Sequence, residues 1–208
     1  MTETPTRQAL VPHIATWTEE QRPEATLIMS GWGIAYANEL PHDRDEDGAL
    51  WIRRQLRQGR GEPEYGNVHA ERQRRVMSSL LCQVCAGPAD RDERGVLWLL
   101  EDNRGDWAGW PNDLLTTHPP VCLPCAREAV RHCPHLLGGH VAVRVKQSDI
   151  FGVYGTRYQP GRLRPVAGSP VVVPYGDPAI RWVLAGQQVR GLNSCTIVDL
   201  RAEVTGHP

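Results

Sequence analysis

Cysteines carry the clearest chemical signal in this sequence. Four of the six form two pairs with the same spacing, Cys82-Gln83-Val84-Cys85 and Cys122-Leu123-Pro124-Cys125, and 36 residues separate the pairs. Two residues between thiols let both sulfurs reach one metal ion at about 2.3 Å, and four thiolates complete the closed tetrahedron of a structural zinc site. A disulfide framework is the alternative, and it would require an oxidising compartment. The spacing therefore predicts Zn²⁺ as a cofactor, with Cys82, Cys85, Cys122 and Cys125 as its ligands.

The segments around the two pairs suggest how they are positioned. Gly87 follows the first pair and can adopt the left-handed backbone that a metal-binding knuckle needs. A polar turn over residues 90–95 and a strand over 96–100 predict a hairpin, and Pro124 predicts a helix that starts at the second pair and runs to about residue 132. Trp107 and Trp110 are expected to cover the metal. This order of knuckle, hairpin and helix-borne pair resembles the treble-clef zinc finger over residues 78–135, a resemblance that implies a structural module and no particular activity.

Other residues with metal-binding side chains lie near the pairs. His132 and Cys133 follow Cys125 by seven and eight positions on the predicted helix, about 10–12 Å along its axis, and cannot share the same ion. His118 could line the site or replace a cysteine, although a histidine beside two prolines is typical of a surface loop. Cys195 stands in an apolar stretch and is expected to be a buried small side chain.

A second motif raises the hypothesis of an enzyme. His69-Ala70-Glu71 resembles the H-A-E motif of zinc-dependent nucleoside and base deaminases. The resemblance implies that His69, Cys122 and Cys125 bind zinc and that Glu71 moves protons. The spacing from His69 to the cysteine pairs does not match that family well. A nuclease of the HNH type would also use a treble clef, but residues 101–113 contain no histidine for it.

Arginines cluster on either side of this motif. If they share an exposed surface, they could contact the phosphates of a nucleic acid or a protein partner, whereas solvated helix faces are the simpler explanation for such clusters. The net charge of −1 does not decide between these. The predicted partner surface consists of Arg53, Arg54, Arg57, Arg72, Arg74 and Arg75.

An internal repeat indicates a supersecondary unit that is used twice. Residues 41–51 (PHDRDEDGALW) match residues 88–98 (PADRDERGVLW) at eight of eleven positions. Each copy places an acidic turn and a glycine before a strand, which predicts the arm of a hairpin. The alternative is chance reuse of a good turn sequence. Only the second copy follows a cysteine pair, so the first cannot bind zinc in the same way.

The rest of the chain predicts mostly short strands. They are expected at residues 13–17, 26–29, 33–36, 140–146, 150–158, 170–175 and 197–200, with the strand at 150–158 pairing with that at 140–146. In the 140–146 strand, Val141, Val143 and Val145 should face the core, and Ala142, Arg144 and Lys146 the solvent. Helices are expected at residues 68–81 and, from the Asp177-Pro178 start signal, from 177 to about 191.

Composition limits the class of protein. The chain has 208 residues, 40% hydrophobic and 23% charged, as is ordinary for a globular protein. It has no apolar run long enough for a membrane helix, no secretory signal and no phosphate-binding loop, which favours a cytoplasmic location. The predicted fold is α+β, with a mostly antiparallel sheet and a central zinc module. The predicted units are residues 1–77, 78–135 and 136–208, the first and last packed together. The predicted function is that of a zinc-stabilised binding or adaptor protein rather than an enzyme. The chain is also similar to uncharacterised proteins of high-GC actinobacteria, which implies no activity.

Overall fold

A single large sheet organises the protein. The computed structural model describes residues 11–31 and 33–203. Its seven-stranded sheet has the order β4-β11-β9-β7-β6, with β10 also paired to β9 and β8 to β11. All pairs are antiparallel except the parallel pair of β4 and β11. The strands of this sheet are β4 (Leu50–Trp51), β6 (Arg91–Asp92), β7 (Gly95–Glu101), β8 (Leu114–Thr116), β9 (His140–Gln159), β10 (Val166–Pro174) and β11 (Val183–Val198). The α+β class predicted from the sequence is confirmed, with a mixed rather than purely antiparallel sheet.

Two long strands, β9 and β11, lie side by side in the middle of the sheet. Two predictions about these segments were wrong. Residues 140–146 and 150–158 do not pair with each other, because they are parts of one continuous strand, β9. The helix expected from residue 177 to about 191 is only the 3-10 helix η2 (Pro178–Trp182). Asp177 does cap it, accepting a hydrogen bond from the Ala179 backbone N–H, but β11 begins at Val183. The reason is long-range: β11 pairs with β9 from Val183 to Val198, which outweighs a local start signal.

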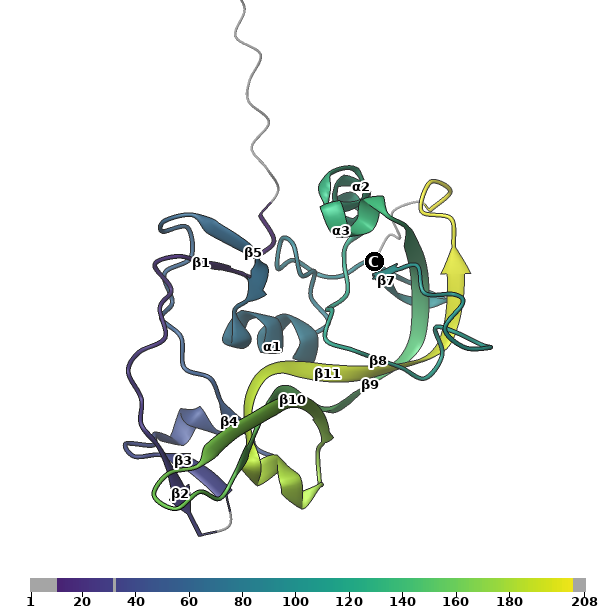
Figure 1. Ribbon diagram of the computed structural model, residues 1–208. Helices are drawn as coiled ribbons and strands as arrows, with labels where there is room; N and C mark the ends of the chain where they lie inside the picture. The colour runs from purple at the N-terminus through teal and green to yellow at the C-terminus, as the bar shows by residue number, and fades with distance from the viewer. Residues whose placement is uncertain (1–10, 32, 204–208) are drawn as a thin grey trace, which may run out of the picture.

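Smaller elements lie beside the large sheet at its β4 end (Figure 1). β1 (Ala15–Trp17) pairs with β5 (Pro63–Val68), and β2 (Leu27–Ser30) pairs with β3 (Gly33–Tyr36). The 3-10 helix η1 (Pro41–Asp43) precedes β4, and α1 (Ala70–Ser78) packs against β11. The helix predicted at residues 68–81 is therefore present but shorter. Two further helices, α2 (Leu123–His132) and α3 (Pro134–Leu137), connect β8 to β9.

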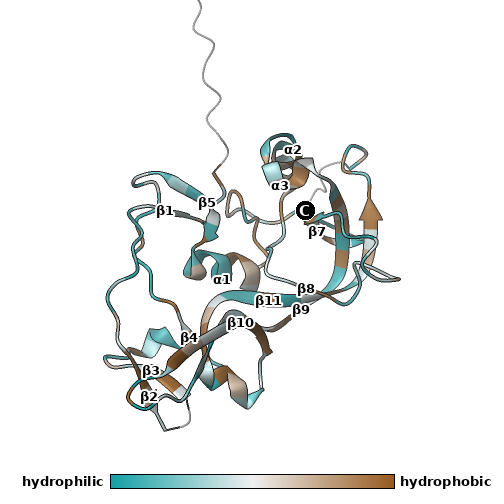
Figure 2. Ribbon diagram, viewed as in Figure 1, coloured by the Kyte–Doolittle hydropathy of each residue, from teal (hydrophilic) through white to brown (hydrophobic). Residues whose placement is uncertain are grey.

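Both faces of β7 are buried, each in a different cluster. Leu97 and Leu99 contribute to the cluster that also contains Cys82 and Leu123, which we call the α2 cluster. Trp98 and its neighbours on the other face pack with Trp110 and Leu192 in a second cluster. β7 is thus enclosed on both sides by apolar side chains. Figure 2 shows the hydropathy of each residue on the same ribbon.

The burial of Arg144 differs from the sequence prediction. This side chain was expected on a solvent-facing side of its strand, but it is fully buried on the face of β9 that it shares with Ala142. Ion pairs explain why a guanidinium is stable there: its nitrogens lie 2.7 Å from Asp90 Oδ1 and 3.5 Å from Asp92 Oδ2, and it also pairs with Glu203. The C-terminal turn of the described chain is thereby tied to β6 and β9.

None of the helices in the described ranges is both long and apolar enough to cross a membrane. The predicted division into residues 1–77, 78–135 and 136–208 stays a prediction, although the large sheet takes strands from all three segments.

Candidate metal centre

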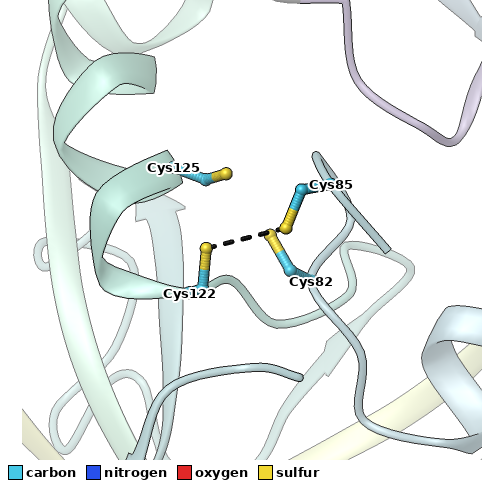
Figure 3. A group of neighbouring side chains, drawn as sticks. All are labelled: Cys82, Cys85, Cys122 and Cys125. Atoms are coloured by element: carbon cyan, nitrogen blue, oxygen red, sulfur yellow. Dashed lines mark hydrogen bonds between the residues drawn. The ribbon is translucent and has the colours of Figure 1, made fainter. Parts of the chain in front are cut away.

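Four cysteine side chains converge from two distant stretches of the chain (Figure 3). Their sulfur atoms all lie within 4.8 Å of one another, and this is the only group of three or more potential metal-ligating side chains within such a distance in residues 11–31 and 33–203. The Sγ atoms of Cys85 and Cys122 are 3.8 Å apart, a separation that sulfur ligands of one tetrahedral ion have. The group consists of Cys82, Cys85, Cys122 and Cys125. Four thiols within metal-binding distance fit a zinc site, as the sequence spacing predicted.

The first pair sits on a tight turn that directs backbone amides at sulfur. The backbone N–H of Ala86 donates to the Cys82 carbonyl, and the N–H of Cys82 donates to the carbonyl of Gly87. The N–H of Val84 points at Cys82 Sγ, 3.4 Å away. The left-handed residue of this turn is Ala86, with φ of 58°, and not Gly87 as predicted. A short side chain tolerates this conformation at a modest energetic cost.

The second pair is carried by the start of α2. Cys122 is the N-cap residue in an extended conformation, and Cys125 stands in the first turn. Pro124 occupies a first-turn position, where the backbone N–H that proline lacks would have no partner within the helix. Because the free amides of a helix N-terminus favour negative charge, this placement suits thiolate ligands. Cys133 caps the other end of the helix and belongs to no metal-binding group, as its spacing predicted.

The segment before Cys122 joins the two pairs. The carbonyl of Pro120 accepts a hydrogen bond from the N–H of Gln83 in the first pair. The next residue, Val121, donates to the carbonyl of Leu97 on β7 and accepts from the N–H of Asp90. The chain entering α2 is therefore hydrogen-bonded to the knuckle on one side and to the β6–β7 hairpin on the other. This hairpin is the second copy of the repeat.

The electrostatics of the cluster favour a bound cation. Burial raises the pKa of the Cys122 thiol to about 11, and burial and the neighbouring sulfurs raise the pKa of Cys125 further. Burial also acts to raise the pKa of Cys85, but the backbone of Gly87 and the other sulfurs outweigh it, so that this pKa is lowered. Crowded thiols cannot all ionise without a positive charge among them. A divalent ion supplies that charge and releases the protons on binding.

The two tryptophans expected to cover the metal do not do so. Trp110 is buried in the cluster on the opposite face of β7, with Trp98. Trp107 is partly exposed, and its indole N–H donates to the carbonyl of Asn112. The side chains that pack around Cys82 are aliphatic instead, among them Val84 and Leu123.

The motif that suggested a deaminase lies elsewhere in the structure. His69 is the N-cap of α1, where its Nδ1 faces the backbone N–H of Arg72 at 3.5 Å and its Nε2 lies 3.3 Å from the carbonyl of Gln55. His69 is not part of the metal-binding group, and Glu71 is exposed on the first turn of α1. The structure does not bring His69 together with Cys122 and Cys125.

Two of the six arginines of the predicted partner surface are held by salt bridges to buried carboxylates, and a third, Arg57, forms only an exposed salt bridge to Glu19 at 3.9 Å. Arg72 is buried, and its guanidinium bonds both oxygens of Glu20 and the carbonyls of His13 and Ala15. Arg53 is paired with Asp43 and lies over the ring of Tyr36, 4.2 Å from its centroid. These two side chains stabilise the N-terminal region instead of forming an exposed surface.

The remaining four are divided between contacts and solvent. Arg54 donates to the carbonyl of Glu20, and Arg74 lies over the ring of Trp51, 4.7 Å from its centroid. Only Arg57 and Arg75 are exposed. The arginines clustered in sequence are thus not gathered into one free surface.

Sequence reasoning missed the basic groups next to the metal-binding helix. Arg127 and Arg131 lie four residues apart on α2, so they share a helix face. Together with Arg104 and Arg201 they line an open groove of about 710 Å³. The spacing on the helix could have indicated this face. The contribution of Arg104 and Arg201, which come from a loop and from the C-terminal turn, could not be read from the sequence.

Comparisons with known proteins add no relative: no protein family, no curated protein and no solved structure matches the chain.

Proposed function

We propose that this chain is a zinc-stabilised binding protein in which one Zn²⁺, held by Cys82, Cys85, Cys122 and Cys125, fixes a platform that contacts a protein partner. The observation that carries the proposal is the convergence of four sulfurs within 4.8 Å of one another from two stretches of chain. A four-thiolate zinc site has no open coordination position for a substrate, so its role is to stabilise the fold.

The order of elements supports a module of the treble-clef type. A cysteine knuckle, the β6–β7 hairpin and the helix α2 follow one another, and both ends of this unit supply two ligands. Free thiolates persist in a reducing compartment, so the cytoplasm is the location we propose. The deaminase alternative and the nucleic-acid alternative receive no comparable support, because His69 and Arg72 are engaged in contacts within the chain.

Metal content in cysteine variants tests the proposal. The protein is purified under reducing conditions without added metal, and zinc per chain is measured by elemental mass spectrometry. Cys85→Ser is the main variant, because Cys85 is exposed and its replacement disturbs packing little. Cys195→Ser is the matched control, since Cys195 lies outside the metal-binding group. We expect about one zinc per chain in the parent and in the control, and at least about a tenfold loss in Cys85→Ser.

Two outcomes would overturn the proposal. A parent protein without zinc, after refolding with excess zinc, would remove the metal site. Zinc retained in Cys85→Ser but lost in His69→Ala would transfer the metal to the deaminase-like ligand set and support an enzyme.

A further inference from the structure

The groove beside the metal-binding helix has the features of a docking site. It lies where α2 approaches the start of β9 and the end of β11 (Figure 1). Basic side chains from four different parts of the chain line it, whereas Asp199 is the only carboxylate among the described residues that line it. The carboxylate of Asp199 is already bonded to the backbone N–H of Arg201. The basic residues are Arg104, Arg127, Arg131, His140 and Arg201.

Most of these arginines are available to an anionic partner. The side chains of Arg104 and Arg131 are 60% and 62% exposed, and within the described part of the chain their ion pairs are with carboxylates two or three residues away, Asp102 and Glu128. Exposed ion pairs of this kind are weak, so an arriving carboxylate can replace them. Arg201 is exposed and forms no ion pair with any described side chain.

The floor of the groove is aliphatic. Val130, Val198 and Leu200 line it and pack against the α2 cluster, and Ile197 is 45% exposed at its side. Figure 2 shows the end of β11 in brown, the colour of hydrophobic residues. Among the described residues that line the groove there is no Phe, Tyr or Trp, and the only ring is that of His140. Single-stranded nucleic acids are usually bound by stacking of successive bases on aromatic rings, so a groove with one histidine and an aliphatic floor favours a polypeptide.

We propose that this groove binds an acidic polypeptide segment, whose carboxylates pair with the arginine rim and whose aliphatic side chains cover the valine and leucine floor. The inference rests on the proposed function and names the partner of the platform. The metal and the groove are coupled through α2: Cys122 and Cys125 fix its first turn, and Arg127 and Arg131 stand on its next turns. Zinc therefore holds the rim in position.

Peptide binding to the zinc-loaded full chain tests the inference. The probe is a fluorescein-labelled 12-residue peptide that repeats Glu-Leu-Glu-Glu three times, and binding is followed by fluorescence anisotropy. Peptides with Lys in place of Glu, and with Ser in place of Leu, separate the contributions of charge and apolar contact. We expect the acidic and aliphatic peptide to bind more tightly than both, with an affinity that falls as salt rises.

Paired charge reversals locate the site. The double variant Arg131→Glu with Arg201→Glu should weaken binding at least about tenfold. The matched control is Arg57→Glu with Arg60→Glu, two exposed arginines at residues 51–60 outside the groove. Each variant is first checked for zinc content and thermal unfolding, so that loss of binding is not loss of fold.

The outcomes distinguish this inference from the proposed function. A protein that holds one zinc but does not bind the peptide contradicts the groove and leaves the metal site intact. Equal weakening by the control pair also contradicts it. A labelled 12-nucleotide poly(U) strand that binds more tightly than the peptide, and competes with it, would assign the groove to nucleic acid instead.

Discussion

The two copies of the repeated sequence, residues 41–51 and 88–98, share a turn at a glycine but differ in the elements that flank it. In each copy the chain turns back on itself through a glycine with positive φ, Gly48 at 84° and Gly95 at 118°. A single antiparallel bridge joins Arg44 to Leu50 in the first copy, whereas in the second Arg91 pairs with Val96 and Asp92 with Gly95, so that β6 and β7 form a hairpin. A strand stands at or after the glycine in both copies, but among the described residues only the second copy has paired strands within itself.

The copies also share their buried positions. Leu50 and Leu97 are fully buried, and the tryptophan that follows each of them is buried as well. The aspartate at the third position of each copy, Asp43 or Asp90, is buried against an arginine. The copies therefore share a turn at a glycine and the positions of their buried aspartate and buried apolar pair.

The copies differ in how far along the chain the arginine partner of the buried aspartate lies. The partner of Asp43 is Arg53, ten residues away on the same small unit, with a side chain 17% exposed. The partner of Asp90 is the fully buried Arg144 on β9, which also binds Glu203. The buried aspartate of the first copy is therefore paired locally, although β4 also pairs with β11 and Asp45 accepts a hydrogen bond from the hydroxyl of Tyr175. The buried aspartate of the second copy pairs with an arginine on the central strand, which also binds the C-terminal turn. The hairpin beside the metal centre is thus the copy whose buried aspartate forms the longer-range ion pair.

Removal of zinc should have the largest effect on stability and should destabilise the second copy more than the first. Chelation is expected to lower the free energy of unfolding of the second copy by at least about 5 kcal/mol, because metal binding free energy is folding free energy in such modules. Hydrogen exchange measures it residue by residue. The amide of Leu97, which donates to Asp90 within the hairpin, and the amide of Val121, which donates from the segment before α2 to Leu97, should lose protection. The amide of Ile52, bonded to Ala185 beside the first copy, should keep it. Equal loss at all three would contradict local control by zinc.

Replacement of the two arginines should separate the copies next. Arg144→Met removes the arginine partner of the buried Asp90 and leaves Glu203 with Arg94 alone, and should cost about 3–5 kcal/mol. Arg53→Met leaves the buried Asp43 with the backbone N–H of Leu40 as a donor and should cost about 2 kcal/mol. Urea unfolding of the zinc-loaded proteins measures both. A larger loss in Arg53→Met would mean that the first copy is the more important one for stability.

Substitution of the turn glycines should show a smaller difference in stability between the two copies. A Cβ atom on Gly95 would lie 2.1 Å from the carbonyl oxygen of Val145, whereas nothing lies within 4 Å of the corresponding position on Gly48. Gly48→Ala should therefore cost only the left-handed backbone, about 1 kcal/mol, and Gly95→Ala about 3 kcal/mol because the strand pairing must also shift. Thermal unfolding of both variants checks the order, and similar midpoints would contradict it.

Acidification should have the smallest effect, a loss of the contribution that Asp43 in the first copy makes to the free energy of unfolding. The hydrogen bonds from Arg53 lower the pKa of Asp43 below its ordinary value of 3.8. A lowered pKa in the folded state means that the carboxylate stabilises the protein above that ordinary value, and that this contribution is lost as pH falls through the lowered pKa. The difference in unfolding free energy between the parent and Asp43→Asn should be constant near neutral pH and shrink below about pH 4. The exposed Asp47→Asn is the charge-matched control, and a difference that grows in acid would show the opposite sign.

The features that the sequence could predict are local ones. The two cysteines of each pair lie within one turn, so equal spacing in two pairs predicts a common metal. The acid, glycine and apolar residues of the repeat also lie within one turn and predict a hairpin arm. The capping role of Asp177 was equally local, and it was confirmed for one short turn.

The rest depended on partners far along the chain. Arg144 looked solvent-facing because its carboxylates lie 54 and 59 residues away, at Asp90 and Glu203. The helix expected up to residue 191 was wrong because β9 offers β11 a pairing partner over its whole length. Arginines that are close in sequence, such as Arg53 and Arg72, are used by different carboxylates. The groove beside α2 combines side chains from four separated segments and has no contiguous signal.

X-ray absorption at the zinc edge of the purified protein tests the central claim most directly, because it counts the ligand atoms around the metal. The account predicts a single shell of four sulfur atoms at about 2.3 Å. A shell that contains nitrogen or oxygen at about 2.0–2.1 Å, as histidine or water would give, contradicts a site closed by four cysteines.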